Sequence, residues 1–398
     1  MRHYIIIASI VLASLGIGIA AYYFLLPSTP ETPAATNYPL PVAENRTPTP
    51  GEIATGNSGV EGSPVSVSAR LVKITSGPVA LGEAVIDIKN GVATSSPEVA
   101  VHFVERQSGN IYSYRTKEGT LTRTSNKTIP GIATAAWLPN GKTAFARYLS
   151  GTDFSTINTY ALHSEGSEGF FLPQDLADIA VSSTSILMLA SGPNGSSASL
   201  SRTDGSRATT LFTTPLSALR VSFAGRNQYF AFTKPASTLA GSAYLVDSSG
   251  NFSRIAGPEN GLTALISPSG KWALTSSVSN GAMTMKLVNT ATGDATTLPI
   301  ATITDKCVWT VDETIIYCGV PRNPPSGKNY PDDWYQGAVS FSDRIWKIQV
   351  AGRYAQLVLD FSTEAKTTLD AESLAINPSG TTLVFVNKND GSLWSYQL

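Results

Sequence analysis

Charged side chains are scarce in this chain. Only 14 % of its 398 residues are charged, and the 28 lysines and arginines almost balance the 29 aspartates and glutamates, which leaves a net charge of −1. The basic residues are scattered along the sequence and do not gather in one stretch. Because nucleic-acid binding depends on a clustered positive face, this composition argues against a nucleic-acid partner.

Residues that commonly carry catalysis and metal binding are also rare. There are 3 histidines, at positions 3, 102 and 163, and none has the spacing of a zinc site. The sequence contains neither a Gly-x-Ser-x-Gly nucleophile turn nor a glycine-rich phosphate loop. We therefore predict no catalytic residue, no metal site and no cofactor.

The sequence does contain a repeat of 43 residues. One apolar marker residue recurs at this spacing at five positions: Trp137, Ala180, Phe223, Ile266 and Trp309. The next counterpart, Ile376, comes 67 residues after Trp309, so one unit carries 24 extra residues. Repeats of about 40–45 residues, each with four short strands, are typical of β-propeller blades.

Each unit has the pattern of four strands. The first carries the marker and ends in a tight turn such as Ser267–Gly270, where proline and glycine suit the turn geometry. The second is apolar, as in 272–276, and the third alternates apolar and polar residues, as in 345–348. The fourth is polar and rich in threonine, as in 120–124, which suits an outer edge.

The two ends of the repeat region complete each other. The last unit ends at Leu398, after its third strand, and an orphan strand at 70–75 has the pattern of a fourth strand. A first strand follows at 83–88. We therefore predict an all-β, seven-bladed β-propeller over residues 69–398, closed by an N-terminal outer strand that completes the last blade.

The period, the strand order and the Pro-Ser-Gly turns resemble WD-repeat and TolB-type propellers over residues 69–398. The recurrent Gly-His and Trp-Asp pairs of WD repeats are absent, and Asn140, Ser269 and Ser379 stand where the TolB-type turn usually has aspartate. The resemblance implies the fold. It implies no single function, because propellers serve as enzymes, scaffolds and receptors.

The N-terminus indicates the compartment. Residues Ile5 to Leu26 form an uncharged run of 22 residues, long enough to cross a bilayer, and Arg2 precedes it. We predict a cytoplasmic tip at 1–4, a transmembrane signal anchor at 5–26 and an extracytoplasmic propeller. Residues 27–68, rich in proline, threonine and serine, are predicted to be a disordered linker. A cleaved signal peptide is the alternative, because Gly18 and Ala20 are small residues at the spacing of a cleavage site.

The only two cysteines lie eleven residues apart. Cys307 and Cys318 fall on the first and second strands of one blade, on either side of a turn. Neighbouring antiparallel strands bring opposite residues close enough for a bridge, and an exported chain favours one. We predict a disulfide, with two unpaired apolar residues as the alternative.

The extra residues of the sixth unit fall at 320–342, between its second and third strands. The loop there should emerge at one mouth of the central channel, and long loops in compact domains are often functional. Its candidate binding residues are Tyr330, Asp332, Asp333, Trp334 and Tyr335. The aromatic pair suits either recognition of a partner or packing onto the blade. The two aspartates alone are too few for a calcium site.

Three functions remain open. The main hypothesis is a membrane-anchored extracytoplasmic binding or scaffold module that recognises a protein, a peptide or a cell-envelope polymer. The alternatives are a carbohydrate-active propeller enzyme and a structural spacer in an envelope or secretion assembly. Asp87, Asp178 and Asp305 lie on expected inner strands. They would favour the enzyme only if carboxylates converge at one channel mouth.

Overall fold

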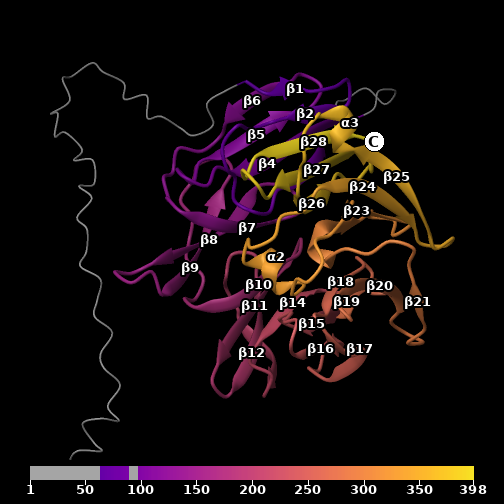
Figure 1. Ribbon diagram of the computed structural model, residues 1–398. Helices are drawn as coiled ribbons and strands as arrows, with labels where there is room; N and C mark the ends of the chain where they lie inside the picture. Colours follow the sequence, from indigo (N-terminus) through magenta and orange to yellow (C-terminus); the bar gives the residue numbers. More distant parts are fainter. Residues whose placement is uncertain (1–62, 89–96) are drawn as a thin grey trace, which may run out of the picture. The chain divides into compact units, whose positions relative to one another are not determined.

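The computed structural model describes residues 63–88 and 97–398, and their strands form seven antiparallel sheets. Figure 1 shows these sheets arranged around a centre, in chain order. The prediction of an all-β, seven-bladed propeller is therefore confirmed. Buried apolar residues form clusters within and between neighbouring sheets, so the core is distributed around the ring.

The blades follow the predicted strand order, with the innermost strand first. The first blade contains β3 (Ala84–Ile88), β4 (Glu98–Val104), β5 (Ile111–Arg115) and β6 (Thr120–Arg123). The second contains β7 (Ile132–Trp137), β8 (Thr143–Ser150) and β9 (Thr156–His163). The third contains β10 (Leu176–Val181), β11 (Ser185–Gly192), β12 (Gly195–Arg202) and β13 (Thr209–Thr214).

The next three blades are also four-stranded. The fourth contains β14 (Leu219–Phe223), β15 (Gln228–Thr233), β16 (Ala240–Asp247) and β17 (Phe252–Asn260). The fifth contains β18 (Thr263–Ile266), β19 (Trp272–Ser279), β20 (Ala282–Asn289) and β21 (Ala295–Thr297). The sixth contains β22 (Cys307–Trp309), β23 (Ile315–Pro321), β24 (Asp343–Gln349) and β25 (Tyr354–Asp360).

The seventh blade closes the ring as predicted. It contains β26 (Ala371–Ile376), β27 (Thr382–Asn387) and β28 (Leu393–Gln397), followed by β2 (Leu71–Lys73) and β1 (Val65–Ser66) from the N-terminal side. Strand β2 pairs antiparallel with β28, which places Leu71 opposite Tyr396 and Lys73 opposite Trp394. The strand β1, which adds a fifth strand at the outer edge, was not predicted.

The second blade departs from the four-strand pattern. Its outer segment contacts β9 through the bridge of Tyr160 with Phe171 and a few backbone hydrogen bonds, such as that from the Leu172 amide to the Thr159 carbonyl, but forms no regular fourth strand. Gly169 explains the close contact there, since a Cβ at this position would lie 1.7 Å from the carbonyl oxygen of Ala161. The prediction of four regular strands is wrong for this blade, because the segment around Gly169 and Pro173 cannot keep a ladder.

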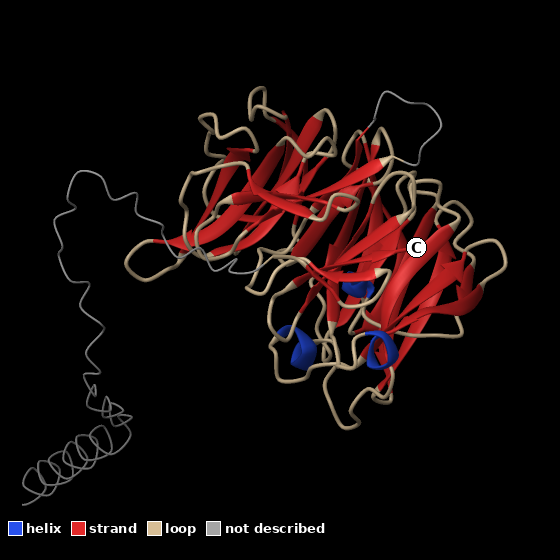
Figure 2. Cartoon of the chain, turned by 90° about the horizontal axis from the view of Figure 1, so that it is seen from above, coloured by secondary structure: helices blue, strands red, loops and turns tan. Residues whose placement is uncertain are grey.

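Helical structure is limited to three short turns among the described residues, as Figure 2 shows. They are η1 (Thr304–Lys306), α2 (Asp332–Tyr335) and α3 (Phe361–Glu364). The turn η1 leads into the inner strand of blade six, whereas α2 lies in the long insertion of that blade. In Figure 1, α2 is drawn near the centre of the ring.

The predicted transmembrane anchor at Ile5–Leu26 and the linker at 27–68, up to residue 62, lie outside the described residues. Within the described part of the chain, no helix is long and apolar enough to cross a membrane. The anchor and the export of the propeller therefore stay predictions.

Candidate functional site

One edge of the ring collects the features that could bind a ligand. In an antiparallel blade, the start of the first strand lies beside the end of the second, as the pairing of Leu219 with Thr233 shows in blade four. The insertion follows the second strand of blade six, so it emerges at this same edge. We call this edge the insertion mouth of the channel.

The predicted binding residue Trp334 is buried in the insertion. Only 2 % of its surface is exposed, and its ring stacks on Phe341 at a centroid distance of 6.3 Å. Its indole N–H donates to the Asp370 carboxylate at 3.0 Å. Together with Ile303 and Tyr330, these aromatic rings form a small separate core. This arrangement matches the packing alternative for Trp334.

Beneath the insertion lies a buried ion cluster. The Lys306 ammonium is 2.8 Å from the Asp343 carboxylate and also bonds Asp370, and all three side chains are fully buried. The ammonium also lies over the rings of Trp334 and Phe341. Burial disfavours the charged lysine, but the two carboxylates outweigh it and raise the pKa of Lys306. Burial raises the pKa of Asp343 to about 6.

The remaining insertion residues also make contacts within the protein. Tyr330 is 2 % exposed, and its hydroxyl donates to the Pro325 carbonyl. The Asp333 carboxylate accepts a hydrogen bond from the Asn329 amide within the loop. The Asp332 carboxylate accepts one from the Ser237 amide of blade four at 2.6 Å. The loop is thus tied both to its own blade and to blade four.

Of the five predicted binding residues, Tyr335 is the most exposed. It is 37 % exposed, and its hydroxyl donates to the Asp305 carboxylate at 2.7 Å. That carboxylate pairs with the Arg220 guanidinium of blade four, with Nη1–O distances of 2.8 and 3.0 Å. Burial of the phenol and the charge of Asp305 raise its pKa, so the hydroxyl is protonated at neutral pH.

The two cysteines form a disulfide in blade six. Cys307 of β22 pairs directly with Cys318 of β23, with a Cα–Cα distance of 4.1 Å. Both residues are buried within the apolar cluster that joins blades five and six. The bridge therefore fastens the inner strand that leads out of η1.

The three aspartates predicted on inner strands do not form one cluster: Asp87 lies on β3 and Asp178 on β10, whereas Asp305 lies in the turn η1. Asp87 accepts hydrogen bonds from Asn377 and Ser379, which link blade one to the turn of blade seven. Asp178 accepts the Val221 amide of blade four and the Ile179 amide of its own strand. Asp305 binds Arg220 and Tyr335 as described above. Each carboxylate binds a group of another blade, which disfavours an acid–base pair made from them.

The opposite part of the insertion mouth is hollow. Two adjoining hollows of about 710 and 340 Å³ lie across blades two, three and four and share Thr134, Arg147 and Ala177. We call them together the cationic groove. The charged and large apolar side chains of its lining include Arg106, Arg147, Tyr148, Leu149, Phe154, Asp178, Arg220 and Lys234.

The groove carries more positive than negative charge. Its walls include Arg106, Arg147, Arg220 and Lys234, and Asp178 is the one carboxylate among its lining residues. Within residues 63–88 and 97–398, no ion pair involves Arg106, Arg147 or Lys234. The groove is therefore a local excess of cations in a nearly neutral chain.

Arg147 is held by a hydrogen bond, but its positive charge is only partly compensated. Its Nη2 donates to the Leu176 carbonyl, while its buried Nε has no hydrogen-bond partner among the described residues. Burial lowers the pKa of Arg147, and the charge of nearby Asp178 acts against that effect. Burial also raises the pKa of Asp178, although the Val221 amide and the charge of Arg220 favour its ionised form.

One end of the groove is apolar and exposed. Leu149, near the end of β8, is 52 % exposed, and Phe154, in the turn between β8 and β9, is 67 % exposed. Tyr148 lies beside them in the lining. A site that joins an exposed aromatic surface to clustered cations can hold a ligand with apolar faces and negative groups.

A carboxyl group with an unusual pKa lies at the boundary of blades seven and one. Burial is the main reason why the pKa of Glu83 rises to about 8, and the charge of Glu372 adds to it. The Ser373 hydroxyl donates to one Glu83 oxygen at 3.2 Å, and the other oxygen is buried without a partner. Ser373 has a positive φ of 51°, in the left-handed region.

The described residues offer no ready metal site. Nowhere in 63–88 and 97–398 do three or more His, Cys, Asp or Glu side chains gather as ligands. Of the histidines there, His102 bonds the Gly141 carbonyl and His163 bonds Thr143. Burial lowers the pKa of His102.

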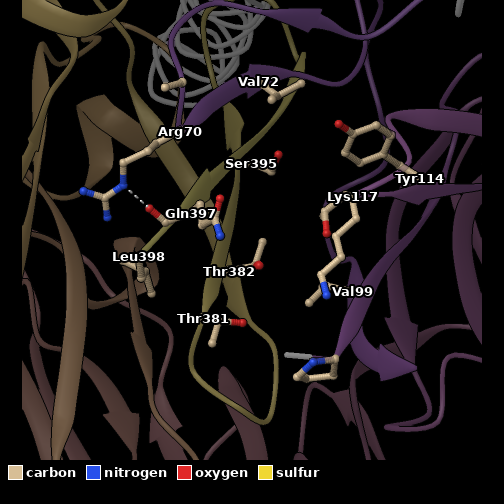
Figure 3. A pocket seen from close by; sticks show the side chains of 13 residues that line it. Arg70, Val72, Val99, Tyr114, Lys117, Thr381, Thr382, Ser395, Gln397 and Leu398 are labelled. Carbon is tan, nitrogen blue, oxygen red and sulfur yellow. Dashed lines mark hydrogen bonds between the residues drawn. The ribbon is translucent and has the colours of Figure 1, made fainter. Parts of the chain in front are cut away.

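A further hollow lies at the closure seam between blades seven and one. Its volume is about 410 Å³, and Figure 3 shows Arg70, Tyr114, Lys117 and Gln397 among its walls. The Arg70 Nε donates to the Gln397 carbonyl at 2.6 Å, and its guanidinium lies over the Tyr396 ring. Arg70 therefore serves ring closure here.

Comparison with known proteins gives a fold and no family. No protein-family model and no curated protein matches the sequence. The WD-repeat and TolB-type resemblance therefore has no family match behind it.

Solved structures do match. One is an oligogalacturonate lyase in complex with manganese, at 10 % identity over 84 % of this chain and 95 % of that one, with a TM-score of 0.57. Another is the oligogalacturonate lyase from Vibrio parahaemolyticus, at 10 % identity over 82 % and 93 %, with a TM-score of 0.55. At this identity the likeness shows the propeller fold alone.

Sequence reasoning missed the cationic groove. Arg147 lies on a second strand, Arg220 on a first strand and Lys234 just after another second strand, in two different blades. One signal was present in the repeat, because Arg220 and Lys306 both lie three residues before a marker, Phe223 and Trp309. Equivalent repeat positions face the same edge of the ring.

Proposed function

We propose that this propeller binds an acidic carbohydrate in the cationic groove. The observation that carries the proposal is the grouping of Arg147, Arg220 and Lys234 around one hollow with Asp178 as the only acid in its lining. Arginine binds carboxylates through charged, directional hydrogen bonds, and lysine adds a mobile positive charge. A uronate residue presents such a carboxylate at every ring.

The apolar end of the groove supports a saccharide as the ligand. Sugar rings have apolar C–H faces as well as hydroxyls, and exposed aromatic side chains cover such faces well. Phe154 and Tyr148 supply aromatic surface within the same hollow as Arg147. A simple inorganic anion would make no use of this surface.

The solved neighbours add modest support. Their names describe action on oligogalacturonate, which is an acidic oligosaccharide, and they share this fold. One of these neighbours holds manganese, whereas the described residues of this chain do not group into a set of metal ligands. The proposal therefore contains no step that depends on a metal.

The proposal narrows the predicted partner to a polymer with negative groups. We include in the proposal that the segment Ile5–Leu26 anchors the chain and that the propeller is exported. The propeller could then reach a cell-envelope polymer of this kind. Protease added outside intact cells should then release the propeller. Protection of the propeller under those conditions would contradict export while leaving the binding test below unaffected.

The binding test uses the purified full-length protein and calorimetric titration. An oligogalacturonate should bind, and a neutral oligosaccharide of equal length should bind at least tenfold more weakly. Added salt should lower the affinity for the acidic oligosaccharide. Arg147→Gln and Lys234→Gln should each lower the affinity about 10-fold, the value of one charged hydrogen bond. Arg254→Gln, on the outer strand β17, is the matched control and should change nothing. Equal affinity for the two saccharides would refute the proposal.

Cleavage of the bound saccharide is a second candidate, favoured by Glu83. A carboxyl with a pKa of about 8 is protonated at neutral pH and can act as a general acid. Its neighbour Leu81 forms a bridge with Thr134, which lines the groove. Incubation of the acidic oligosaccharide with the protein should then yield shorter products, and Glu83→Gln should abolish them. Unchanged chain length would leave a binding protein.

A further inference from the structure

The insertion of blade six reaches the cationic groove through a chain of three side chains. The Tyr335 hydroxyl donates to Asp305 Oδ2 at 2.7 Å, and the same oxygen lies 2.8 Å from Arg220 Nη1. Arg220 lines the groove beside Asp178. A residue of the insertion is therefore connected to a cation of blade four, on a different side of the channel.

The base of this chain is rigid. Tyr335 follows Trp334, which is buried and bonded to Asp370, and the two rings meet edge to face at 5.3 Å. Asp332, at the start of the same helix α2, accepts the Ser237 amide of blade four. The phenol is therefore fixed from both sides, as a positioning group should be.

The end of the chain is suited to a ligand. The Arg220 side chain keeps 39 % exposure although Asp305 is paired with it. Both hydrogen bonds to Asp305 leave from the single nitrogen Nη1, so the carboxylate approaches one corner of the guanidinium. The charge of Asp305 raises the pKa of Arg220, so the group stays positive throughout the working range of pH.

We propose that Tyr335 is a positioning residue, which through Asp305 holds Arg220 in the orientation that recognises a ligand carboxylate. The inference rests on the proposed function, because it concerns the acidic saccharide of the same groove. It assigns the insertion a role in specificity. Without the hydroxyl, Asp305 loses one of its two partners, and the long arginine side chain gains rotamer freedom that binding must remove.

The decisive variant is Tyr335→Phe, which keeps the ring against Trp334 and removes only the hydroxyl. In the full-length protein it should lower the affinity for oligogalacturonate about 3- to 10-fold and leave the affinity for the neutral oligosaccharide and the melting temperature unchanged. Tyr354→Phe, an exposed tyrosine at the start of β25, is the control and should have no effect.

A double-mutant cycle identifies the route. If Tyr335 acts through Arg220, then Tyr335→Phe combined with Arg220→Gln should bind no more weakly than Arg220→Gln alone. Additive losses would overturn the positioning role. Wild-type affinity in Tyr335→Phe, with a clear loss in Arg147→Gln, would overturn it as well and leave the proposed function standing.

A measurement without saccharide separates the two proposals. Phenylglyoxal modifies exposed arginines, and mass spectrometry gives the rate at each site. Tyr335→Phe should raise the rate at Arg220 severalfold and leave Arg254 unchanged. An unchanged rate at Arg220 refutes the positioning role even if no acidic saccharide binds. A raised rate at Arg220 without saccharide binding would support the positioning role of Tyr335 and refute the acidic saccharide as the ligand.

Discussion

Two cations at equivalent positions of the repeat have opposite surroundings. Lys306 is fully buried between Asp343 and Asp370 beneath the insertion, whereas Arg220, two periods earlier, keeps 39 % exposure in the groove. The backbone offers the same place in both blades. What differs is the cover: blade six carries an insertion that closes over its cation, and blade four does not. The same repeat position can thus stabilise the fold or remain available for a ligand.

The largest difference is expected when each cation is replaced by methionine. Lys306→Met leaves two buried carboxylates without their counter-charge and should cost about 3–5 kcal/mol of unfolding free energy. Arg220→Met should cost less than about 1 kcal/mol, because its ion pair with Asp305 is partly exposed. Denaturant unfolding of both variants measures the two values. Similar losses in the two would break the comparison.

The aromatic residues on the two sides of the mouth should differ in the same way. Trp334→Ala removes a buried ring and should cost about 3–5 kcal/mol, with a clear fall in melting temperature. Phe154→Ala, at the exposed end of the groove, should change stability by less than about 0.5 kcal/mol and weaken saccharide binding. If Trp334→Ala left the melting temperature unchanged, the packing role of the insertion would be wrong.

The disulfide lies on the covered side and should have an intermediate effect. Its loop spans eleven residues, so the bridge should contribute about 2–3 kcal/mol by restricting the unfolded chain. Replacing Cys307 and Cys318 together by alanine should lower stability by that amount and leave saccharide affinity unchanged. Two free thiols in the natively isolated protein, detected by alkylation and mass spectrometry, would remove the basis for this expectation.

The last prediction concerns how stability depends on pH. The pKa of Glu83 is about 8 in the folded protein and near 4.5 when unperturbed, so the folded state keeps a proton that the unfolded state releases. Stability should therefore fall as pH rises from about 4.5 to about 8, by up to about 1.4 kcal/mol per pH unit. Glu83→Gln should flatten this part of the curve of melting temperature against pH. An identical slope in the variant would show that Glu83 is ionised in the folded protein.

The ring could be predicted in some detail, because the strands of a propeller recur at a regular spacing along the sequence. The 43-residue period places the inner strands, and the orphan strand around Leu71 finds its partner in β28. The same reasoning failed for the outer strand of blade two. Its marker is in register, but tight contacts at Gly169 interrupt the outer strand, and no periodic signal records such a contact.

The site was harder to predict than the ring. The insertion was recognisable by its length, yet nothing local distinguishes buried Trp334 from partly exposed Tyr335, its immediate neighbour. The difference arises from Lys306 and Asp370, which lie far away in the sequence and meet only in the folded ring. The groove likewise depends on how blades two to four stand side by side, which no single segment encodes.

The closure of the ring has a mechanical consequence. The strand β2 joins β28 through three residue pairs, aided by Arg70 on Gln397, and is the place where the N-terminal side of the chain enters the ring. If the N-terminal segment is held in a membrane while the groove holds a polymer, tension on that polymer passes through this short ladder. The seam between β2 and β28 then carries this load, together with the hydrogen bonds that Ile74 and Arg70 add on either side of the ladder.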